Sequence, residues 1–488
     1  MYRLVLYVLL SILGVAAVLG VMGIIPYGAE NIIGSTFVII GVSWLTNKIF
    51  ARAFKAQMNV ESVYITGLIL ALIVTPATSF HDVVFLFWVS VWAMASKYIF
   101  AINKKHLFNP AAFAIALTAV TINQSGSWWV ATASLMPFVL IGGLLITRKI
   151  HRFDLVLSFI VAAMVAILGM KIAHGGDIVA ASGKVFINTP ILFFAFIMLT
   201  EPLTTPPTRM LRVWYGMITG FLFAPWVHIG TIFSTPELAL LVGNIFSYIV
   251  SPKYKFVLKL KEIIPVAQDV YDFVFEHARG FRFSPGQYFE WTLGHTNPDN
   301  RGNRRYFTIA SAPTEDNIRI GVKFYKEPSS FKEALGALNR GEAIIASQLS
   351  GDFILPKDQK KKLVFIAGGI GVTPFRSMIK YLIDKNEVRD IVLLYTNRFP
   401  HDIAYKDIFE EAKKFGIRTI YTVTERTEGW TGNTGYINKE MISKEIPDFG
   451  TRTFYISGPH GMVESYHSML RGMGISQKNI KTDYFPGF

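Results

Sequence analysis

The sequence predicts a polytopic α-helical membrane half, followed by an antiparallel β-barrel and a doubly wound α/β domain. Residues 1–250 are almost continuously apolar, short alternating strands follow, and strand–helix alternation begins near Lys361. A mean hydropathy of +0.38 is high for a water-soluble protein of 488 residues. We therefore expect a transmembrane domain at 1–250, a barrel at 251–356 and a nucleotide-binding domain at 357–488.

The apolar half contains ten candidate membrane spans. A helix needs about 20 apolar residues to cross a bilayer, and three of the ten segments fall well below that length. The candidates are 2–25, 31–47, 60–77, 81–100, 108–122, 128–147, 154–172, 188–200, 212–230 and 235–251.

The basic residues of this half predict its orientation. Twelve of the 14 Lys and Arg residues up to Val250 fall at Arg3 or in alternate loops between the spans. Cytoplasmic loops carry an excess of Lys and Arg. We therefore expect a multi-pass protein of a prokaryotic plasma membrane, with both termini and the soluble domains in the cytoplasm. Basic residues confined to short loops do not predict a nucleic-acid partner.

The redox carrier predicted for this chain is organic. The sequence has no cysteine, which excludes Cys-ligated iron–sulfur clusters, thiolate-bound zinc and disulfides. The histidines of the apolar half fall in loops or at span ends, so a haem held by facing pairs of histidines is not expected. We predict no metal site.

The strand at 306–310 carries a candidate flavin site. In Arg305-Tyr306-Phe307-Thr308 the guanidinium offers a cation for a pyrophosphate and the phenyl ring a plane for an isoalloxazine. The Thr308 hydroxyl would steady hydride arrival at the reacting nitrogen, so Thr308 is a catalytic candidate. Tyr306 belongs to the same cofactor-binding stretch.

A phosphate-binding helix start is expected shortly after this strand. Ser329 and Ser330 precede a helical stretch over 332–338, whose free N-terminal amides could hold a phosphate. Alone this signal is weak, because most such serines are simply N-caps.

A glycine turn follows the buried strand predicted at 363–367. Its motif residues are Gly368, Gly369, Gly371, Thr373 and Pro374. Glycines let the backbone approach a diphosphate at a helix N-terminus, and Thr-Pro begins the helix. We expect a nicotinamide nucleotide here.

A second motif follows the late strand at 454–456. It reads Ser457-Gly458-Pro459-x-x-Met462. We expect all four residues at the nucleotide site. Ser457 lies at the carboxyl edge of the sheet, beside the position a nicotinamide must take, and is the second catalytic candidate.

These motifs together resemble the ferredoxin–NADP⁺ reductase superfamily across about 255–488. The chain has RxFT where the family has RxYS, GGxGxTP, and SGPxxM where the family often has CGPxxM. The resemblance implies FAD and NADH or NADPH as cofactors. It also implies that the C-terminal aromatic residues Phe485 and Phe488 stack on the flavin.

The apolar half resembles a second family. Phe108-Asn109-Pro110-Ala111 and the stretch 200–208 are similar to segments of the RnfD/NqrB family, the membrane proteins of the Rnf electron-transport complex and of the sodium-pumping NADH:quinone reductase. That family has about ten helices and a flavin in its membrane domain. Its Ser-Gly-Ala-Thr segment, which carries FMN covalently, is absent here. The resemblance therefore implies non-covalent FMN or riboflavin, for which the candidate residues are Asn109, Thr200, Thr204 and Thr205.

The function expected is that of a membrane-bound NAD(P)H dehydrogenase. Hydride would pass from NAD(P)H to cytoplasmic FAD, and electrons would then pass singly to a flavin or quinone-type acceptor in or across the membrane. Membrane lipid, a quinone, an extracytoplasmic flavoprotein and Rnf-like subunits are the expected partners.

Two alternatives and one choice of cofactor stay open. In the first alternative the chain is one component of a redox-driven Na⁺ or H⁺ pump. Carboxylates inside the membrane would favour a pump, but those of the apolar half fall near span ends. A transporter with a regulatory flavodomain is the other. The segments 396–398 and 424–426 offer both signs of charge to the adenine ribose, and analogy with the membrane family favours NADH.

Overall fold

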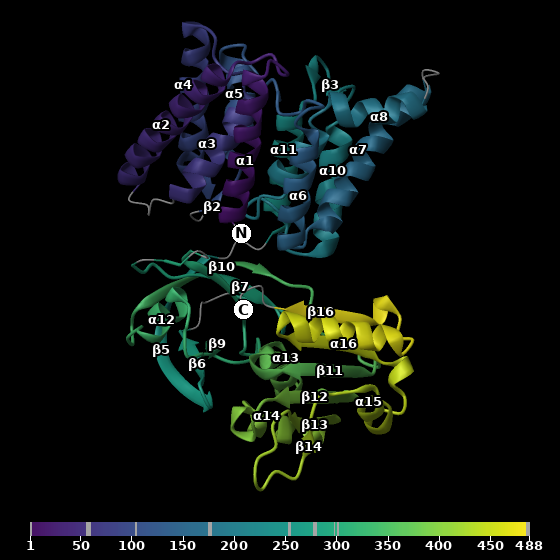
Figure 1. Cartoon of the computed structure of the whole chain (residues 1–488). Coiled ribbons are helices and arrows are strands. Elements are labelled where there is room, and N and C mark those ends of the chain that lie inside the picture. The colour runs from purple at the N-terminus through teal and green to yellow at the C-terminus, as the bar shows by residue number, and fades with distance from the viewer. Residues whose placement is uncertain are drawn as a thin grey trace. The chain divides into compact units, whose positions relative to one another are not determined.

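The computed structural model describes residues 2–54, 60–102, 105–173, 178–251, 255–276, 281–296, 298–299 and 302–484. The chain divides into two compact units, Met1–Lys253 and Tyr254–Phe488. Figure 1 labels the elements of both units.

The first unit is helical. Its helices are α1 (Tyr2–Val21), α2 (Ala29–Ala53), α3 (Val60–Ile73), α4 (Phe80–Ile99), α5 (Pro110–Thr121), α6 (Met136–Ile150), α7 (Phe153–Ala173), α8 (Ile178–Asn188), α9 (Ile191–Phe193), α10 (Arg209–Leu222) and α11 (Pro236–Val250). Two short hairpins, β1 (Ala101–Ile102) with β2 (Lys105–His106) and β3 (His228–Ile229) with β4 (Ile232–Phe233), join helices. Within this unit the chain start and β2 lie at one end and β3 at the other (Figure 1).

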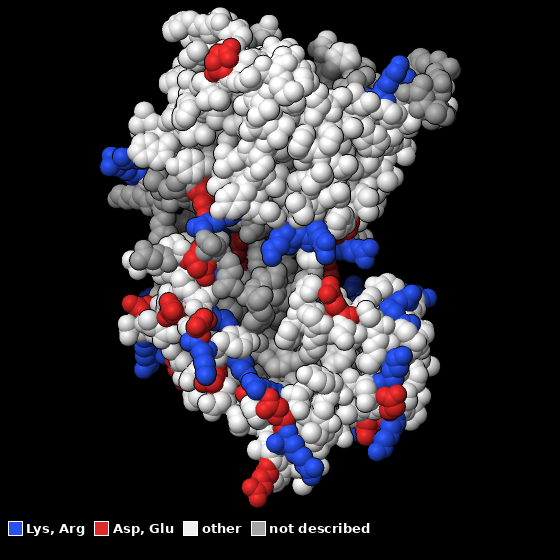
Figure 2. Space-filling model, viewed as in Figure 1, with Lys and Arg blue, Asp and Glu red and all other residues white. Residues whose placement is uncertain are grey.

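Four described helices are long and apolar enough to cross a membrane, namely α1, α2, α4 and α7. The helices α3, α5 and α11 are apolar but shorter. At 1.5 Å per residue, the 14 residues of α3 rise about 21 Å, less than the bilayer core of about 30 Å. The view in Figure 2 shows a first unit with few charged side chains across its middle, whereas both signs of charge are scattered over the second unit.

One predicted span begins later than the sequence suggested. The span expected at 128–147 starts as irregular chain, and helix α6 begins only at Met136. The amide of Trp128 donates to the carbonyl of Ile73 at 2.8 Å, and the amide of Val130 donates to that of Leu72 at 3.2 Å. These bonds satisfy carbonyls that the end of α3 leaves open, so the segment serves as a cap for another helix.

The span expected at 188–200 is also broken. Here α9 passes into a π-helix, Phe194–Met198, which is buried throughout. Single π turns inside helices are frequent at functional sites. The stretch 199–208 follows it and contains the hydroxyl-rich segment singled out by the sequence.

The second unit begins with an antiparallel half-barrel. Its six strands are β5 (Lys255–Ala267), β6 (Val270–Phe275), β7 (Tyr288–Thr292), β8 (Arg304–Thr308), β9 (Ile318–Lys323) and β10 (Ala343–Ser350), in the order β8-β7-β10-β5-β6-β9. No ladder pairs β8 with β9 among the described residues. The antiparallel barrel expected from the sequence is therefore a half-barrel.

The rest of the second unit is a parallel α/β sheet. Its strands are β11 (Leu363–Gly368), β12 (Ile391–Asn397), β13 (Ile417–Val423), β14 (Asn433–Thr434), β15 (Thr453–Gly458) and β16 (Ile480–Tyr484), in the order β14-β13-β12-β11-β15-β16. Its helices are α13 (Thr373–Asp384), α14 (Lys406–Glu411), α15 (Lys439–Glu445) and α16 (His460–Gly472), and α12 (Ser330–Gly336) belongs to the half-barrel. Strands β11 and β12 are buried along their whole length, as expected for a sheet covered on both faces.

Candidate functional site

The glycine turn lies where the sequence predicts it. Strand β11 ends at Gly368, a 3-10 turn covers Gly369–Val372, and α13 starts at Thr373. Gly369 has a φ of +51°, in the left-handed region that favours glycine. The turn thus opens a helix at the carboxyl edge of the sheet, where doubly wound folds bind nucleotides.

The two nucleotide motifs are in direct contact. A Cβ on Gly371 would lie 2.6 Å from the carbonyl oxygen of Ser457 and 2.5 Å from the Cα of Gly458. A Cβ on Gly368 would lie 2.2 Å from the sulfur of Met462. The register of β11 with β15 places Ala367 beside Ser457. Only glycine allows this approach, so the motifs, about 90 residues apart in sequence, form one site.

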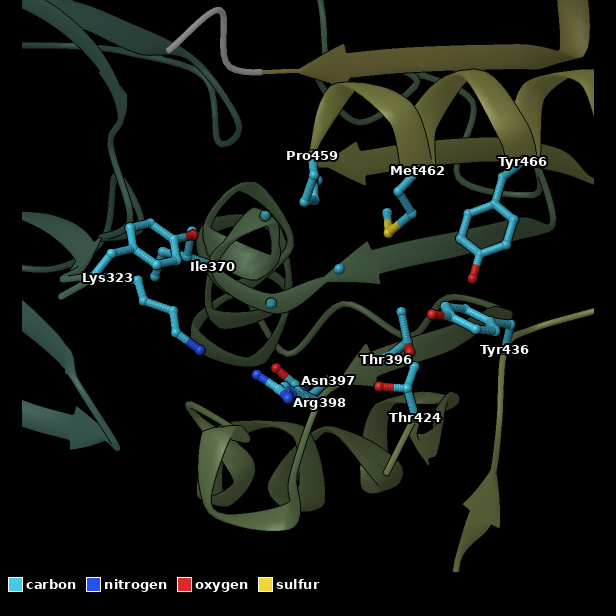
Figure 3. Close-up of a pocket in the computed structure, with 15 residues that line it drawn as sticks. Lys323, Ile370, Thr396, Asn397, Arg398, Thr424, Tyr436, Pro459, Met462 and Tyr466 are labelled. Carbon is cyan, nitrogen blue, oxygen red and sulfur yellow. The ribbon is translucent and has the colours of Figure 1, made fainter. Parts of the chain in front are cut away.

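A pocket of about 240 Å³ opens over this contact. In Figure 3, Met462 and Tyr466 extend from α16 into the pocket, and Tyr466 points toward Tyr436. In this view Lys323 and Arg398 are drawn on the side of the pocket away from Tyr466. The residues that line the pocket are Lys323, Tyr325, Gly368, Gly369, Ile370, Gly371, Thr396, Asn397, Arg398, Thr424, Tyr436, Gly458, Pro459, Met462 and Tyr466.

Several buried polar atoms here lack a hydrogen-bond partner among the described residues. They are the hydroxyls of Thr308 on the predicted flavin strand, Ser457 in the second nucleotide motif and Thr396 in the pocket lining. Buried polar groups are normally satisfied, and each exception needs an explanation. A flavin and a nicotinamide nucleotide, bound at the two predicted cofactor motifs, would supply hydrogen-bond partners for such groups.

The predicted flavin strand is β8. The guanidinium of Arg305 contacts both carboxylate oxygens of Asp299 at 3.0 Å and lies over the ring of Phe331. Phe307 packs against the same ring, with 5.9 Å between centroids. Arg305 and Phe307 therefore share one face, as the alternation of a strand requires.

Tyr306 points the other way. It is 37% exposed, and its hydroxyl donates to the buried carboxylate of Glu290 at 3.0 Å. The structure thus does not place Tyr306 with Arg305 and Phe307, because successive residues of a strand face opposite sides.

The two serines at the start of α12 are engaged within the half-barrel. Ser329 caps the helix by accepting from the amide of Lys332 at 3.4 Å. The Ser330 hydroxyl accepts from the amide of Asp299 at 2.9 Å, and so lies close to the Arg305–Asp299 pair. Helix start and arginine are therefore brought together, as a shared phosphate site requires.

Sequence reasoning missed Asp483. It lies on the edge strand β16, in register with Ser457 of β15. One of its carboxylate oxygens is buried without a hydrogen-bond partner among the described residues, and burial raises the pKa of the Asp483 carboxyl to about 7. The sequence signal was an acidic residue just before the aromatic C-terminus. Phe485 and Phe488 themselves lie outside the described residues.

An ion pair lies where the sequence predicts the adenine ribose. The Nε atom of Arg398 lies 2.6 Å from a carboxylate oxygen of Glu425. Both side chains are largely exposed. The opposite charges expected at these positions are therefore paired with each other.

In the first unit, the two segments predicted to share a flavin meet. The Asn109 side-chain amide donates to a carboxylate oxygen of Glu201 at 2.8 Å, and His106 lies 3.2 Å from the other oxygen. The Asn109 backbone amide donates to the side chain of Asn244 on α11 at 2.7 Å. Asn109 also caps α5 through the amide of Ala112.

The threonine hydroxyls of the second segment bond locally. Thr200 donates to the carbonyl of Phe196 at 2.7 Å, and Thr205 donates to that of Glu201 at 3.0 Å. Thr204 makes longer contacts of 3.4 Å with Glu201. All three threonines are buried, and their hydroxyls cap the broken helix end.

Comparison with known proteins identifies the nucleotide-binding part. Residues 365–468 match the family described as oxidoreductase NAD-binding domain. The chain is 29% identical over 216 residues to a flavohemoprotein of Oceanobacillus iheyensis, covering 42% of this chain and 51% of that protein. It is 26% identical over 236 residues to the glycine betaine monooxygenase reductase subunit of Pseudomonas aeruginosa, covering 46% and 64%. A flavohemoglobin from Malassezia yamatoensis, solved with FAD and haem, aligns with a TM-score of 0.45 at 19% identity over 72% of this chain and 98% of that one.

The chain thus spans between about half and two thirds of the length of these two curated relatives. The second unit is a ferredoxin reductase-like, FAD- and NAD(P)-binding oxidoreductase domain, and the expected enzyme class, an NAD(P)H-dependent reductase, is confirmed. The family match lies entirely within this unit.

Proposed function

We propose that the chain is a membrane-bound NAD(P)H dehydrogenase that feeds electrons from a cytoplasmic nucleotide into a membrane acceptor. The observation that carries this proposal is the contact of Gly371 with Ser457 and Gly458, which makes one nucleotide site from two motifs. The unsatisfied hydroxyl of Thr308 on the flavin strand supports a second ligand.

The chain's own residues divide the work. Arg305, beside the start of α12, would hold the pyrophosphate of FAD. Its ion pair with Asp299 would then be replaced by one with the phosphates. Phe307 supports the ring system, and Thr308 offers it a hydroxyl. FAD, when bound, accepts a hydride and releases electrons one at a time. The turn at Gly368–Gly371 receives the nucleotide diphosphate, and Ser457 borders the nicotinamide.

The first unit, in this proposal, is a membrane domain similar to the RnfD/NqrB family. Its ten predicted spans would include shorter helices such as α3 and α5, beside the four long ones. A non-covalent FMN or riboflavin near Asn109 and 200–205 would receive the electrons. The hydrogen bond between Asn109 and Glu201 supports a shared site, because it joins the two segments. The electrons would then pass to a quinone, to an extracytoplasmic flavoprotein or to partner proteins of an Rnf-like complex.

Flavin extraction tests this proposal. Purified full-length protein should release FAD together with one smaller flavin, identified by mass. One FAD and no second flavin would restrict the proposal to the second unit. Absence of FAD would contradict it altogether.

A redox-driven Na⁺ or H⁺ pump is the second candidate, and one observation favours it. Glu237 in the first turn of α11 is only 5% exposed, and it accepts a hydrogen bond of 2.7 Å from the Trp128 indole. Buried carboxylates in membrane domains are usually functional. NADH oxidation by sealed vesicles, with and without an ionophore, separates the candidates. A pump speeds up when the ionophore collapses the gradient, and an uncoupled dehydrogenase does not.

A further inference from the structure

Two side chains of helix α13 bind the end of the flavin strand. A guanidinium nitrogen of Arg376 donates to the carbonyl of Ala310 at 3.1 Å, and the Ser377 hydroxyl donates to the carbonyl of Ser311 at 2.7 Å. Ala310 and Ser311 closely follow Thr308 along the chain, and Arg376 and Ser377 closely follow the Thr-Pro of the glycine turn. The two motifs that must face each other for hydride transfer are thus joined through neighbouring residues.

Both contacts are buried, and the one that Arg376 makes is charge-assisted. Arg376 is 4% exposed and Ser377 is fully buried. Glu315, just beyond Ser311, pairs with the Arg376 guanidinium through both oxygens and accepts from the amide of Ala312. Because Arg376 and Ser377 bind main-chain carbonyls, they fix the backbone of the strand end and not merely a side chain. Charge-assisted hydrogen bonds out of water hold such geometry strongly.

A second contact joins the half-barrel and the α/β part nearby. Tyr405, just before α14, donates its hydroxyl to the buried carboxylate of Asp272 on β6 at 2.5 Å. On β9, a Cβ at Gly321 would lie 2.4 Å from that hydroxyl and 2.8 Å from the Cγ2 of Thr373. The missing side chain at Gly321 lets the half-barrel approach the first residue of α13. Contacts between domains commonly allow the domains to move relative to one another. The buried hydrogen bonds of Arg376, Ser377 and Tyr405 oppose such motion between the half-barrel and the α/β part.

We propose that Arg376 and Ser377 are positioning residues that set the separation between the nicotinamide turn and the flavin strand. This inference rests on the proposed function of the second unit. Neither side chain need touch a cofactor, since each acts through the backbone at 310–311. A displacement of about 1 Å at reacting atoms costs roughly 100-fold in rate. Loosening these bonds should therefore slow hydride transfer while both ligands still bind.

The test compares Ser377→Ala with Thr422→Val in the full-length protein. Thr422, fully buried in β13, contacts only the sulfur of Met441 with its hydroxyl, at 3.9 Å, among the described residues. Both variants lose one buried hydroxyl. Arg376→Lys and Arg376→Met form a second pair, in which lysine keeps a cationic donor. FAD content, NADH affinity, the single-turnover rate of FAD reduction and the long-wavelength charge-transfer absorbance of the NAD–flavin complex are measured for each.

Ser377→Ala should keep its FAD, bind NADH within about 2-fold of wild type and reduce FAD about 10-fold more slowly, with a weaker charge-transfer band. Hydrogen exchange should rise at 308–311 and 368–377. Thr422→Val should match wild type, and Arg376→Lys should recover part of the rate lost in Arg376→Met. Equal rates and equal charge-transfer bands in Ser377→Ala and Thr422→Val would overturn the positioning role alone. Failure of both NADH and NADPH to reduce wild-type FAD would overturn the proposed function, and this inference with it.

Discussion

Ser457 and Asp483 stand opposite one another in the parallel pairing of β15 with β16, and each carries a buried side-chain oxygen with no hydrogen-bond partner among the described residues. Paired residues on neighbouring strands face the same side of a sheet. A hydroxyl and a carboxyl whose pKa burial raises to about 7 therefore share the edge of the sheet at which the glycine turn opens.

The rate of FAD reduction by NADH should depend on the charge of Asp483. The pKa of about 7 means that this carboxyl is neutral below pH 7 and anionic above it. Hydride arrival adds negative charge at the flavin, and a nearby carboxylate opposes it, so the rate should fall as pH rises through about 7. In Asp483→Asn the fall should disappear, as stopped-flow mixing across a pH series centred on neutrality would show.

Asp448→Asn is the matched control for that experiment. Hydrogen bonds from Arg452 and Lys362 lower the pKa of Asp448 to about 2, so its charge does not change near neutrality. Its profile should keep the wild-type shape. A profile in Asp483→Asn that still bends near neutral pH would assign the ionisation to another group.

Replacing Arg305 with alanine should lower FAD occupancy far more than NADH affinity. The arginine lies beside the start of α12 and is expected to pair with the FAD pyrophosphate. Flavin content after gel filtration and NADH binding by calorimetry measure the two effects. Arg304→Ala, which removes the neighbouring cation paired with Glu290, should keep its FAD. Full flavin occupancy in Arg305→Ala would show that Arg305 is not needed to bind FAD.

Wild-type protein should prefer NADH, and Glu425→Ala should shift it toward NADPH. Glu425 neutralises Arg398 where the adenine ribose is expected, and its removal frees a cation for a 2′-phosphate. The ratio of kcat/KM for the two nucleotides should move by about 10-fold, or ~1.4 kcal/mol. Arg398→Ala should not show this shift. A wild-type preference for NADPH beyond about 10-fold would reverse the assignment.

The Thr204→Ala/Thr205→Ala double variant should lose electron transfer beyond FAD but not FAD reduction itself. These buried hydroxyls cap the broken helix end beside Glu201 and Asn109, where the membrane flavin is proposed. Reduction of FAD by NADH and reduction of a soluble quinone are followed in the same preparation. Thr121→Ala, an exposed helix-end hydroxyl bonded to Leu117, serves as control. This site would be ruled out if the double variant reduced quinone at the wild-type rate and the wild-type protein carried one flavin per chain.

The sequence predicted local elements well where periodicity is strong. Strand β11, Leu363–Gly368, contains the buried strand predicted at 363–367, because a continuous apolar run ends there at a glycine turn. The spans predicted at 128–147 and 188–200 were interpreted as continuous apolar helices, since composition does not reveal which carbonyls need a cap. Edge strand β16 was missed, because a short strand beside Ser457 has no signal of its own.

The candidate site was predictable in its motifs but not in its long-range contacts. The meeting of Gly371 with Ser457 follows from known strand–turn–helix geometry. The pairs Asp272–Tyr405 and Arg376–Ala310 join residues 133 and 66 positions apart, and only the folded arrangement shows them. The carboxylates of the apolar half were expected near span ends, and the burial of Glu237 with its hydrogen bond from the Trp128 indole was not predicted.

Anaerobic titration of detergent-purified full-length protein with NADH tests the central claim most directly. Visible absorbance is followed during the titration, and the flavins are then extracted and identified by mass. We predict FAD in the extract, loss of its absorbance as NADH is added, and a second flavin that NADH also reduces. An extract without FAD, or bound FAD whose absorbance neither NADH nor NADPH changes, would contradict the proposed function.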